Sequence, residues 1–372
     1  RNMPHFIAAP GFAALSRYFD SKLCEFKALR IRISTKGNLM CVIEIPAAAP
    51  SWPPPLKPGD KAAVIAPASP PPDTRSGLRS AVRSLKALGL KPVIMPGCRM
   101  RTGHLAGPDR QRARDMNAAF ADDDIRGIFC LRGGCGAMRL LPLLDTDIIR
   151  RHPKIFIGYS DITALHVFLN QRCGLVTFHG PMAGADYTTM DAFTVASMKR
   201  RLFHTARPGP IAEPPAALWK RSFPGRAEGI LAGGNLTVLA AGLGTPYEID
   251  TRGRILFLED VNEPLYRLDR NLTSLALAGK FDDCAGVLLG TFEGCPLTSR
   301  PTPEALSLED ILKGFLEPLG KPVVRNLQAG HSFPQVTLPL GACLRMEAER
   351  KASADENAVS GIDESIANIF VL

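Results

Sequence analysis

The sequence predicts an α/β protein with an N-terminal parallel sheet, covered by helices on both faces, and a second, mixed α/β domain. In the first half, short apolar and β-branched runs alternate with segments of helical periodicity, as in strands joined by crossover helices. The chain has 372 residues, 45% hydrophobic and 22% charged, which suffices for two domains with ample cores. A Pro-rich stretch without periodicity, residues 205–228, predicts a linker between domains at 51–204 and 229–372.

The elements of the first domain are expected in the order strand, then helix, repeated along the chain. The strands are expected at 62–66, 91–97, 127–134 and 155–157, and the helices near 74–89, 108–120, 137–144 and 162–169. In the second domain we expect strands at 254–261 and 285–292 around a helix near 266–279, and a strand-rich end from Lys321. Parallel sheets carry their chemistry at the carboxyl ends of the strands, where the turns at 66–69, 132–134 and 158–161 would meet.

Composition excludes several classes of protein. No stretch reaches the roughly 18 apolar residues that a membrane-spanning helix needs. The net charge is +9, of which +4 (seven basic minus three acidic residues) lies in residues 1–50, and no basic block indicates a nucleic-acid partner. Nine scattered cysteines without a CxxC pair argue against a disulfide framework or a zinc ribbon, so we expect a reducing cytoplasm and no metal. Cys130 and Cys135 are interpreted as packing residues.

Residues 1–50 differ from the remainder and are left out of the expected fold. They lack the ordered charged, apolar and small-residue segments of a signal peptide. Their basic bias leaves a targeting segment open, and an upstream extension ahead of a start at Met40 is an equal alternative. We expect them to be dispensable.

Ser160 stands between an apolar strand and a helical segment in KIFIGYSDITALHVFL. A hydroxyl at such a turn is exposed beside backbone N–H groups that can stabilise an oxyanion, as a nucleophile requires. The alternative is that Ser160 caps the helix, since Ser is a preferred N-cap residue and Ile162 replaces the second Gly of the GxSxG turn. The local pattern leaves both open.

A serine nucleophile needs a base and a group that orients the base. His179 and His331 both follow apolar runs and precede turns, so either could be the base. Glu259 ends the apolar strand RILFLED, where a carboxylate needs partners. Its alternative role is a salt bridge with the arginines of YRLDR, Arg267 or Arg270.

Seven motifs in order resemble the LD-carboxypeptidase family of serine peptidases, also called muramoyltetrapeptide carboxypeptidases. The similarity runs from about Leu56 to the end of the chain. The motifs are LKPGDKAAVIAPAS, FCLRGGCGAMRLLPLLD, IGYSDITALH, FHGPM, GGNLTVLAA, FLEDVNEPLYRLDR and AGHSFPQVTLPLG. The resemblance implies a class I glutamine amidotransferase-like N-terminal domain that carries the nucleophile. It also implies a C-terminal domain that carries the glutamate and histidine, with the site at their interface, in a cytoplasmic homodimer.

The resemblance assigns roles to individual residues. Its serine, histidine and glutamate triad corresponds to Ser160, His331 and Glu259. The backbone N–H groups of Asp161 and of the turn at Gly134 would form the oxyanion hole. In the same turn, Gly133 would contact the substrate. A carboxypeptidase must also hold the free carboxylate of its substrate, and Arg132 is the candidate to do so bidentately, with a role in the fold as the alternative. Cys135 departs from the family pattern, which more often has an aromatic residue there.

The implied reaction is hydrolysis of the bond between the L-centre of a diamino acid and a terminal D-alanine in muropeptides, with no cofactor. Two rivals remain. A branch similar to microcin C self-immunity proteins cuts peptidyl or aminoacyl nucleotides with the same triad, and Trp219 is the candidate for a base-stacking aromatic residue. The other rival is a muropeptide-binding protein without catalysis, against which an intact triad argues.

Overall fold

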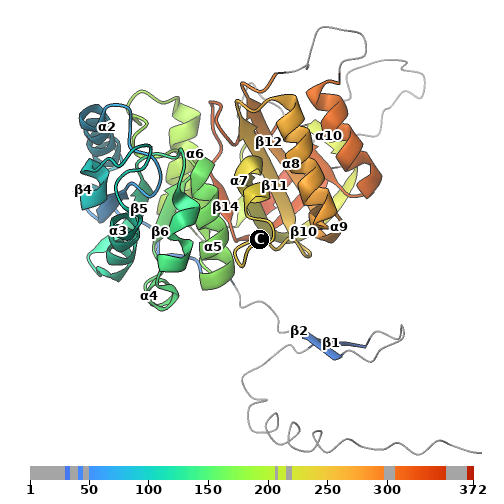
Figure 1. The fold of residues 1–372 in the computed structure, drawn as a ribbon, viewed down its shortest axis with the longest axis horizontal. Helices are drawn as coiled ribbons and strands as arrows, with labels where there is room; N and C mark the ends of the chain where they lie inside the picture. Colours follow the sequence, from blue (N-terminus) through green and yellow to red (C-terminus); the bar gives the residue numbers. More distant parts are fainter. Residues whose placement is uncertain are drawn as a thin grey trace, which may run out of the picture. The chain divides into compact units, whose positions relative to one another are not determined.

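The computed structural model describes residues 30–33, 41–44, 50–205, 208–214, 220–296, 306–348 and 367–372. The chain divides into two units, residues 1–49 and 50–372. In the first unit, strands β1 (Arg30–Ile33) and β2 (Cys41–Glu44) pair in antiparallel fashion. The second unit contains all the other described elements (Figure 1). That residues 1–50 are dispensable stays a prediction.

The first sheet of the second unit is mostly parallel, as predicted. Its strand order is β14-β7-β6-β5-β3-β4, and the strands from β7 to β4 run parallel to their neighbours. The bounds are β3 Lys61–Ile65, β4 Lys91–Ile94, β5 Ile125–Cys130, β6 Ile155–Gly158, β7 Thr177–His179 and β14 Leu338–Leu340. Strand β14 comes from the C-terminal part of the chain and pairs antiparallel with β7.

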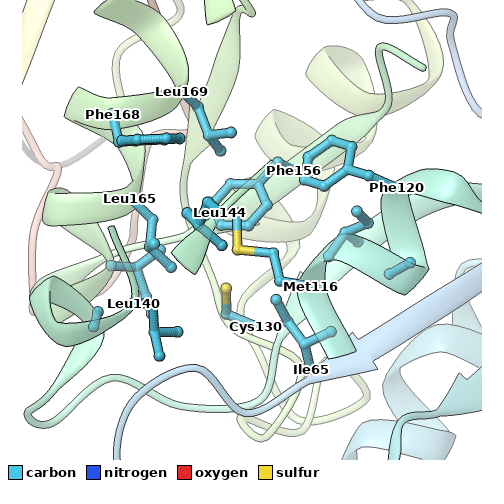
Figure 2. Close-up of a cluster of buried hydrophobic side chains, with 14 of the residues drawn as sticks. Ile65, Met116, Phe120, Cys130, Leu140, Leu144, Phe156, Leu165, Phe168 and Leu169 are labelled. Atoms are coloured by element: carbon cyan, nitrogen blue, oxygen red, sulfur yellow. The ribbon is translucent and has the colours of Figure 1, made fainter. Parts of the chain in front are cut away.

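Helices cover both faces of this sheet (Figure 1). Successive strand residues point to opposite faces, so Ala63 and Ile65 pack in one hydrophobic cluster and Ala62 and Val64 in another. The first cluster includes residues of α3 and α5 (Figure 2) and also of α4, and the second includes residues of α2 and α6. The helices are α2 Thr74–Ala87, α3 Asp109–Ala121, α4 Thr146–Arg151, α5 Thr163–Cys173 and α6 Ala192–Phe203. Burial on both faces explains why the strands read as continuous apolar runs.

Three short 3₁₀ helices interrupt the alternation of strands and α-helices in this part. They are η1 Pro96–Arg99, η2 Ala137–Leu143 and η3 Ser160–Ile162. The expected helix at 137–144 is therefore a 3₁₀ helix, and it contains Pro142. Proline has no backbone N–H and disfavours an α-helical interior, which accounts for the difference.

The second part of the chain is α/β, as predicted, and its sheet is mixed, with the order β8-β16-β15-β10-β11-β12-β13-β9. Strands β10 to β13 are parallel, and the flanking strands are antiparallel. The strands are β8 Gly209–Pro210, β9 Lys220–Phe223, β10 Gly225–Asn235, β11 Ile255–Val261, β12 Gly286–Glu293, β13 Val323–Arg325, β15 Cys343–Ala348 and β16 Ala367–Val371. The helices are α7 Leu236–Ala241, α8 Leu265–Leu277, α9 Lys280–Asp283, α10 Leu308–Leu316 and the 3₁₀ helix η4 Glu317–Leu319.

The segment expected as a linker, 205–228, supplies strands to this second sheet. Strands β8 and β9 lie at its two edges, and β10 begins at Gly225. Short edge strands without alternation leave little periodic signal, so the Pro-rich sequence did not indicate them. Trp219 lies outside the described residues.

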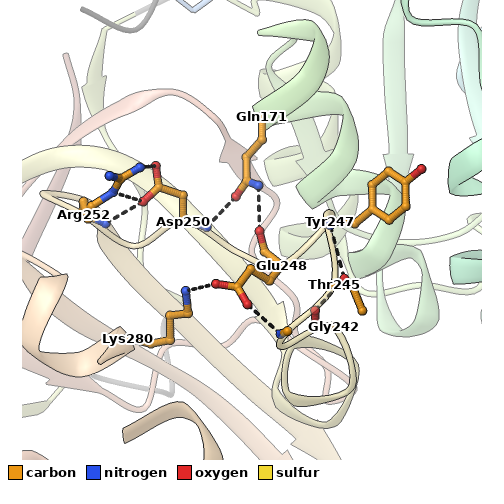
Figure 3. Close-up of polar contacts among 9 residues, drawn as sticks. Gln171, Gly242, Thr245, Tyr247, Glu248, Asp250, Arg252 and Lys280 are labelled. Carbon is orange, nitrogen blue, oxygen red and sulfur yellow. Dashed lines mark hydrogen bonds and ion pairs between the residues drawn. The ribbon is translucent and has the colours of Figure 1, made fainter. Parts of the chain in front are cut away.

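Hydrogen bonds join the parts of the chain that carry the two sheets. Gln171 of α5 accepts from the backbone N–H of Asp250 at 2.7 Å and donates to the carbonyl of Glu248 at 2.9 Å (Figure 3). The Glu248 carboxylate in turn pairs with Lys280 at 2.8 Å. Asn170, next to Gln171, donates to the carbonyl of Leu340 in β14 at 3.1 Å. Helix α5, which starts just after Ser160, is thereby fixed both to the segment 248–250 that precedes β11 and to strand β14.

Candidate active site

Ser160 occupies a tight turn between β6 and α5. Its φ is 66°, in the left-handed region that residues other than glycine rarely adopt. Neither η3 nor α5 has a side-chain capping bond at its start, so Ser160 does not act as the cap that the alternative required. The side chain of Asp161 instead accepts from the backbone N–H of Ala137 at 2.8 Å, and burial raises its pKa. The turn thus leaves the hydroxyl of Ser160 uncommitted to helix capping.

Two further turns lie against Ser160, as the argument from strand ends predicted. A Cβ at Gly133 would lie 2.9 Å from the Cβ of Ser160, so only glycine fits there without displacement. Gly134 has φ 116°, and a Cβ there would lie 2.5 Å from the hydroxyl oxygen of Ser69. That oxygen accepts from the N–H of Cys135 at 3.1 Å, and the N–H of Ser69 donates to the Gly133 carbonyl at 3.2 Å. The backbone of the glycine turn is held close to Ser160 in this way.

Glu259 lies near the end of β11 and is completely buried. The pairing of β11 with β12 is irregular between Leu258 and Asp260, a bulge of the kind that re-aims a side chain. Its Oε2 accepts from Nδ1 of His331 at 2.8 Å. Burial acts to raise the pKa of Glu259, but the facing imidazoles of His179 and His331 outweigh it and lower the pKa. The carboxylate therefore stays ionised in an apolar setting.

The salt-bridge alternative for Glu259 is wrong in this structure. Arg267 pairs with Glu263 at 3.5 Å, and Arg270 lies over the ring of Tyr266, with its guanidinium carbon 5.4 Å from the ring centroid. Both arginines thus have other neighbours, and the partner of Glu259 is His331.

A buried polar network holds the end of β11 against the helix that follows Ser160. Asp260 accepts from the side-chain amide of Asn235 at 2.9 Å and from the hydroxyl of Thr237 at 2.8 Å. The backbone N–H of Asn235 donates to the hydroxyl of Thr163, in α5, at 3.0 Å. A Cβ at Gly234 would lie 2.5 Å from that hydroxyl, so this glycine allows the close approach. The GGN motif thus fixes the strand of Glu259 to the Ser160 segment.

The three histidines near the site have different surroundings. His331 is partly exposed, and its ring lies edge-on to Tyr159 with centroids 4.9 Å apart. His166 is buried with both ring nitrogens bonded, to Thr177 at 2.8 Å and to the Gly158 carbonyl at 2.9 Å, and burial lowers its pKa to about 3. His166 is thus a structural residue of the helix.

His179, the other candidate base, is fully buried on β7. Its Nε2 lies 4.0 Å from Oε1 of Glu259, on the other side of the carboxylate from His331. The structure therefore brings both candidate histidines to Glu259, and His331 is the one that also lines the pocket of Ser160.

One pocket of about 580 Å³ is lined by Ser160, His331, Arg132, Gly133 and Gly134 together. Nη1 of Arg132 donates to the Pro70 carbonyl at 2.9 Å, which anchors the guanidinium at the pocket wall. This volume suits a small organic ligand or a peptide end.

Other residues that line this pocket were not predicted from the sequence. They are Tyr159 and the first turns of α2, with Asp73, Ser76 and Ser80. The available signal was Asp73 itself, whose side chain accepts from the N–H of Arg75 as a helix N-cap. An N-cap at Asp73 indicates that a helix begins soon after the turn at 66–69, and therefore that its first turns lie near the site.

Three findings concern the cysteines, metal sites and membrane-spanning helices. Cys130 is buried in the core, whereas Cys135 is exposed, so the interpretation of Cys135 as a packing residue is wrong. Within the described ranges, no three His, Cys, Asp or Glu side chains gather as a metal site would need. In the same ranges, no helix has both the length and the apolar character to cross a membrane.

Two models of one protein family match this chain. Residues 62–180 match the LD-carboxypeptidase N-terminal domain, and residues 228–346 match the LD-carboxypeptidase C-terminal domain. The chain is 40% identical to the "Probable murein peptide carboxypeptidase" of Bacillus subtilis, over 82% of this chain and 94% of the relative.

Two solved structures have a similar fold. The muramoyltetrapeptide carboxypeptidase of Oxalobacter formigenes is 29% identical, with a TM-score of 0.69 over 84% of this chain and 98% of its own. The microcin C7 self immunity protein is 25% identical, with a TM-score of 0.74 over 87% of this chain and 98% of its own. By its identity to the Bacillus relative over most of both chains, and by its match to both domains, this chain belongs to the LD-carboxypeptidase family.

Proposed function

We propose that this protein is a serine-type LD-carboxypeptidase. It hydrolyses the bond between the L-centre of a diamino acid and a terminal D-alanine in muropeptides, with Ser160 as nucleophile, His331 as base and Glu259 as the group that orients the base. The observation that carries the proposal is the 2.8 Å bond from His331 to the buried Glu259, at the wall of the pocket that Ser160 lines. The names of the Bacillus and Oxalobacter relatives support the peptide substrate.

The reaction starts with proton transfer from Ser160 to His331. With Nδ1–H donated to Glu259, the other ring nitrogen of His331, Nε2, is the acceptor. Oγ of Ser160 attacks the scissile carbonyl carbon as its proton moves to Nε2, and the charge of Glu259 stabilises the imidazolium. The negative charge on the carbonyl oxygen is stabilised by the backbone N–H groups of Asp161 and Gly134.

Collapse of the tetrahedral intermediate breaks the C–N bond. His331 returns its proton to the leaving amine of D-alanine, and an acyl-enzyme on Ser160 remains. A water molecule then attacks the acyl carbon and gives a proton to His331. His331 passes this proton to Oγ of Ser160 as the bond from Oγ to the acyl carbon breaks, which releases the shortened peptide and regenerates the free enzyme. No redox partner or cofactor is needed for this balance of atoms.

Arg132 is the group proposed to hold the terminal carboxylate of the substrate. Its side chain is exposed at the pocket, while one nitrogen is fixed to the Pro70 carbonyl. A guanidinium held by one nitrogen still presents others to a carboxylate, which supports recognition of a free C-terminus. Gly133, which lacks a side chain and so lets the turn approach Ser160 closely, is proposed to contact the backbone of the substrate.

Hydrolysis of peptidyl or aminoacyl nucleotides is the second candidate. It is supported by the fold similarity to the microcin C7 self immunity protein, which has also been solved in complex with aspartyl sulfamoyl adenosine. Cytoplasmic location and a homodimer are further proposals that rest on the family resemblance; fractionation and light scattering test them.

One assay separates the candidates. The protein is incubated with a defined muramoyl tetrapeptide and, in parallel, with an aminoacyl sulfamoyl adenosine, and free D-alanine and free amino acid are measured. D-alanine release that is absent from Ser160→Ala supports the proposal. Cleavage of the nucleotide substrate alone would favour the second candidate, and tetrapeptide binding by the wild type without any cleavage would indicate a muropeptide-binding protein.

A further inference from the structure

His179 and Glu259 present to each other two buried polar groups that lack hydrogen-bond partners. Both side chains have 0% exposure, and Nε2 of the imidazole lies 4.0 Å from Oε1 of the carboxylate. Among the described residues, neither ring nitrogen of His179 has a partner within hydrogen-bond length. Oε1 of Glu259 has none among them either. Buried polar atoms are rarely left unpaired, and two such atoms that face each other point to an interaction between them.

From this arrangement we propose that His179 is a positioning residue for Glu259, with its Nε2–H directed at Oε1 so that Oε2 is held toward His331. This inference rests on the proposed function, because it assigns Glu259 to the orientation of the base. His179 itself touches no reacting atom. A movement of about 1 Å would bring the pair to hydrogen-bond length.

The need for a second anchor follows from the freedom of the Glu259 side chain. The terminal torsion of a glutamate is broad and roughly two-fold, so one hydrogen bond to His331 does not fix the plane of the carboxylate. Two glycines pack closely against it and supply no side chain that could hold it. A Cβ at Gly330 would lie 2.9 Å from Oε2, and a Cβ at Gly290 would lie 3.0 Å from the Cβ of Glu259. A donor on the opposite oxygen removes the remaining freedom.

The surroundings of His179 explain why it can act from one fixed position. Its ring lies edge-on to Phe257 with centroids 5.1 Å apart, and 5.8 Å from the ring of Tyr159. Its backbone lies in β7, paired with Leu338 of β14. A phenylalanine would fill the same space without buried nitrogens, so packing alone does not account for an imidazole here.

The charged and titratable groups around Glu259 define what a change at His179 does to pH dependence. His331 and His179 contact the carboxylate, and Tyr159, Asp260 and Cys295 are close enough for its charge to act on their pKa values. The imidazole of His179 helps to lower the pKa of Glu259. Its removal should therefore raise the pKa of Glu259 and move the acid limb of the kcat profile to higher pH.

The test compares His179→Phe, which keeps a ring but no donor, with His179→Gln, whose amide N–H reaches toward the same oxygen. We expect the Phe variant to lose about tenfold to a hundredfold in kcat, by misplacement of the base, with KM little changed. Its acid limb should move to higher pH. The Gln variant should recover most of the wild-type kcat, and the acid limb of its kcat profile should lie at the wild-type pH. Phe257→Leu is the packing control, because it loosens the same ring without removing Nε2; it should lower thermal stability without moving the limb.

A measurement without substrate separates this inference from the proposed function. In wild-type protein with isotope-labelled histidine, NMR should show Nε2 of His179 as the protonated nitrogen and a downfield Nδ1–H proton from His331. In the Phe variant, the NMR signal of that proton should be shifted or broadened. In the Gln variant, the signal should return to its wild-type position. If these spectra are observed but no D-alanine is released, the proposed function is refuted while the positioning role of His179 is retained.

An unprotonated Nε2 in wild-type His179 overturns the inference, even if the Phe variant does not fold. So does a folded Phe variant with an unchanged His331 proton and an unchanged pH profile.

Discussion

Replacement of Glu259 by glutamine removes one charge from the site and almost no volume. The amide fits the space that the carboxylate occupies beside Gly330, but it cannot stabilise the imidazolium of His331 by charge. The two groups are bonded at 2.8 Å and Glu259 is completely buried, so little solvent screens them. For unit charges about 4 Å apart at an effective dielectric constant of about 20, the interaction is about 4 kcal/mol. At about 1.4 kcal/mol per tenfold, Glu259→Gln should lower kcat about a thousandfold.

The assay is steady-state release of D-alanine from a defined tetrapeptide, with thermal unfolding measured in parallel. We expect the variant to stay folded with a somewhat lower melting temperature, because the lowered pKa of Glu259 means that the folded state favours the ionised carboxylate. Asp269→Asn makes the same chemical change on the exposed side of α8 and should leave kcat unchanged. A folded Glu259→Gln protein within about threefold of the wild-type kcat would refute the role of this charge.

Four further outcomes are expected. Ser160→Ala and His331→Ala should each remove most of the rate, and the double variant should be hardly slower than either, since such groups act as a unit; a multiplicative loss in kcat would contradict this. A chain that begins near Ser51 should express as soluble, active protein, and loss of solubility would show that residues 1–50 are needed. Activity should survive dialysis against a chelator; inactivation reversed by zinc would indicate another reaction class. Asp109, whose pKa is lowered by hydrogen bonds from Arg139 and Arg112 against some burial, contributes stability above its unfolded pKa that is lost as pH falls through the folded pKa. Asp109→Asn should therefore lower the unfolding free energy by roughly 1 kcal/mol at pH 7, in urea melts, and the gap should close in acid; an equal gap at both pH values would contradict the linkage.

The parts predictable from sequence are those determined by local pattern. The buried strands are read from apolar runs such as Ile155–Ile157, because both faces of a parallel sheet are covered. The turn at Ser160 is read from the change of period directly after Gly158. Convergence of three turns follows from the rule that parallel strands share one carboxyl edge.

What the sequence could not predict depends on partners far away in the chain. Strand β14 is only three residues long and contains Pro339, which an edge strand tolerates but which weakens a strand signal. Its choice of β7 as partner is set by tertiary packing. His179 and Glu259 are likewise separated by 80 residues (259 − 179), so no local pattern could show that they face each other. The exposure of Cys135 also depends on which side of the glycine turn is covered.

The pairing of His179 with Leu338 has a consequence for synthesis of the chain. Strand β7 leaves the ribosome about 160 residues (338 − 179) before the strand that covers it. At about 5–20 residues per second, its outer edge stays open for roughly ten to thirty seconds. An open strand edge can pair with another nascent chain, so this interval is when aggregation competes with folding. A ribosome that stalls before Leu338 releases a chain whose first sheet is unfinished, and such fragments should depend on chaperones in a way that the complete protein does not.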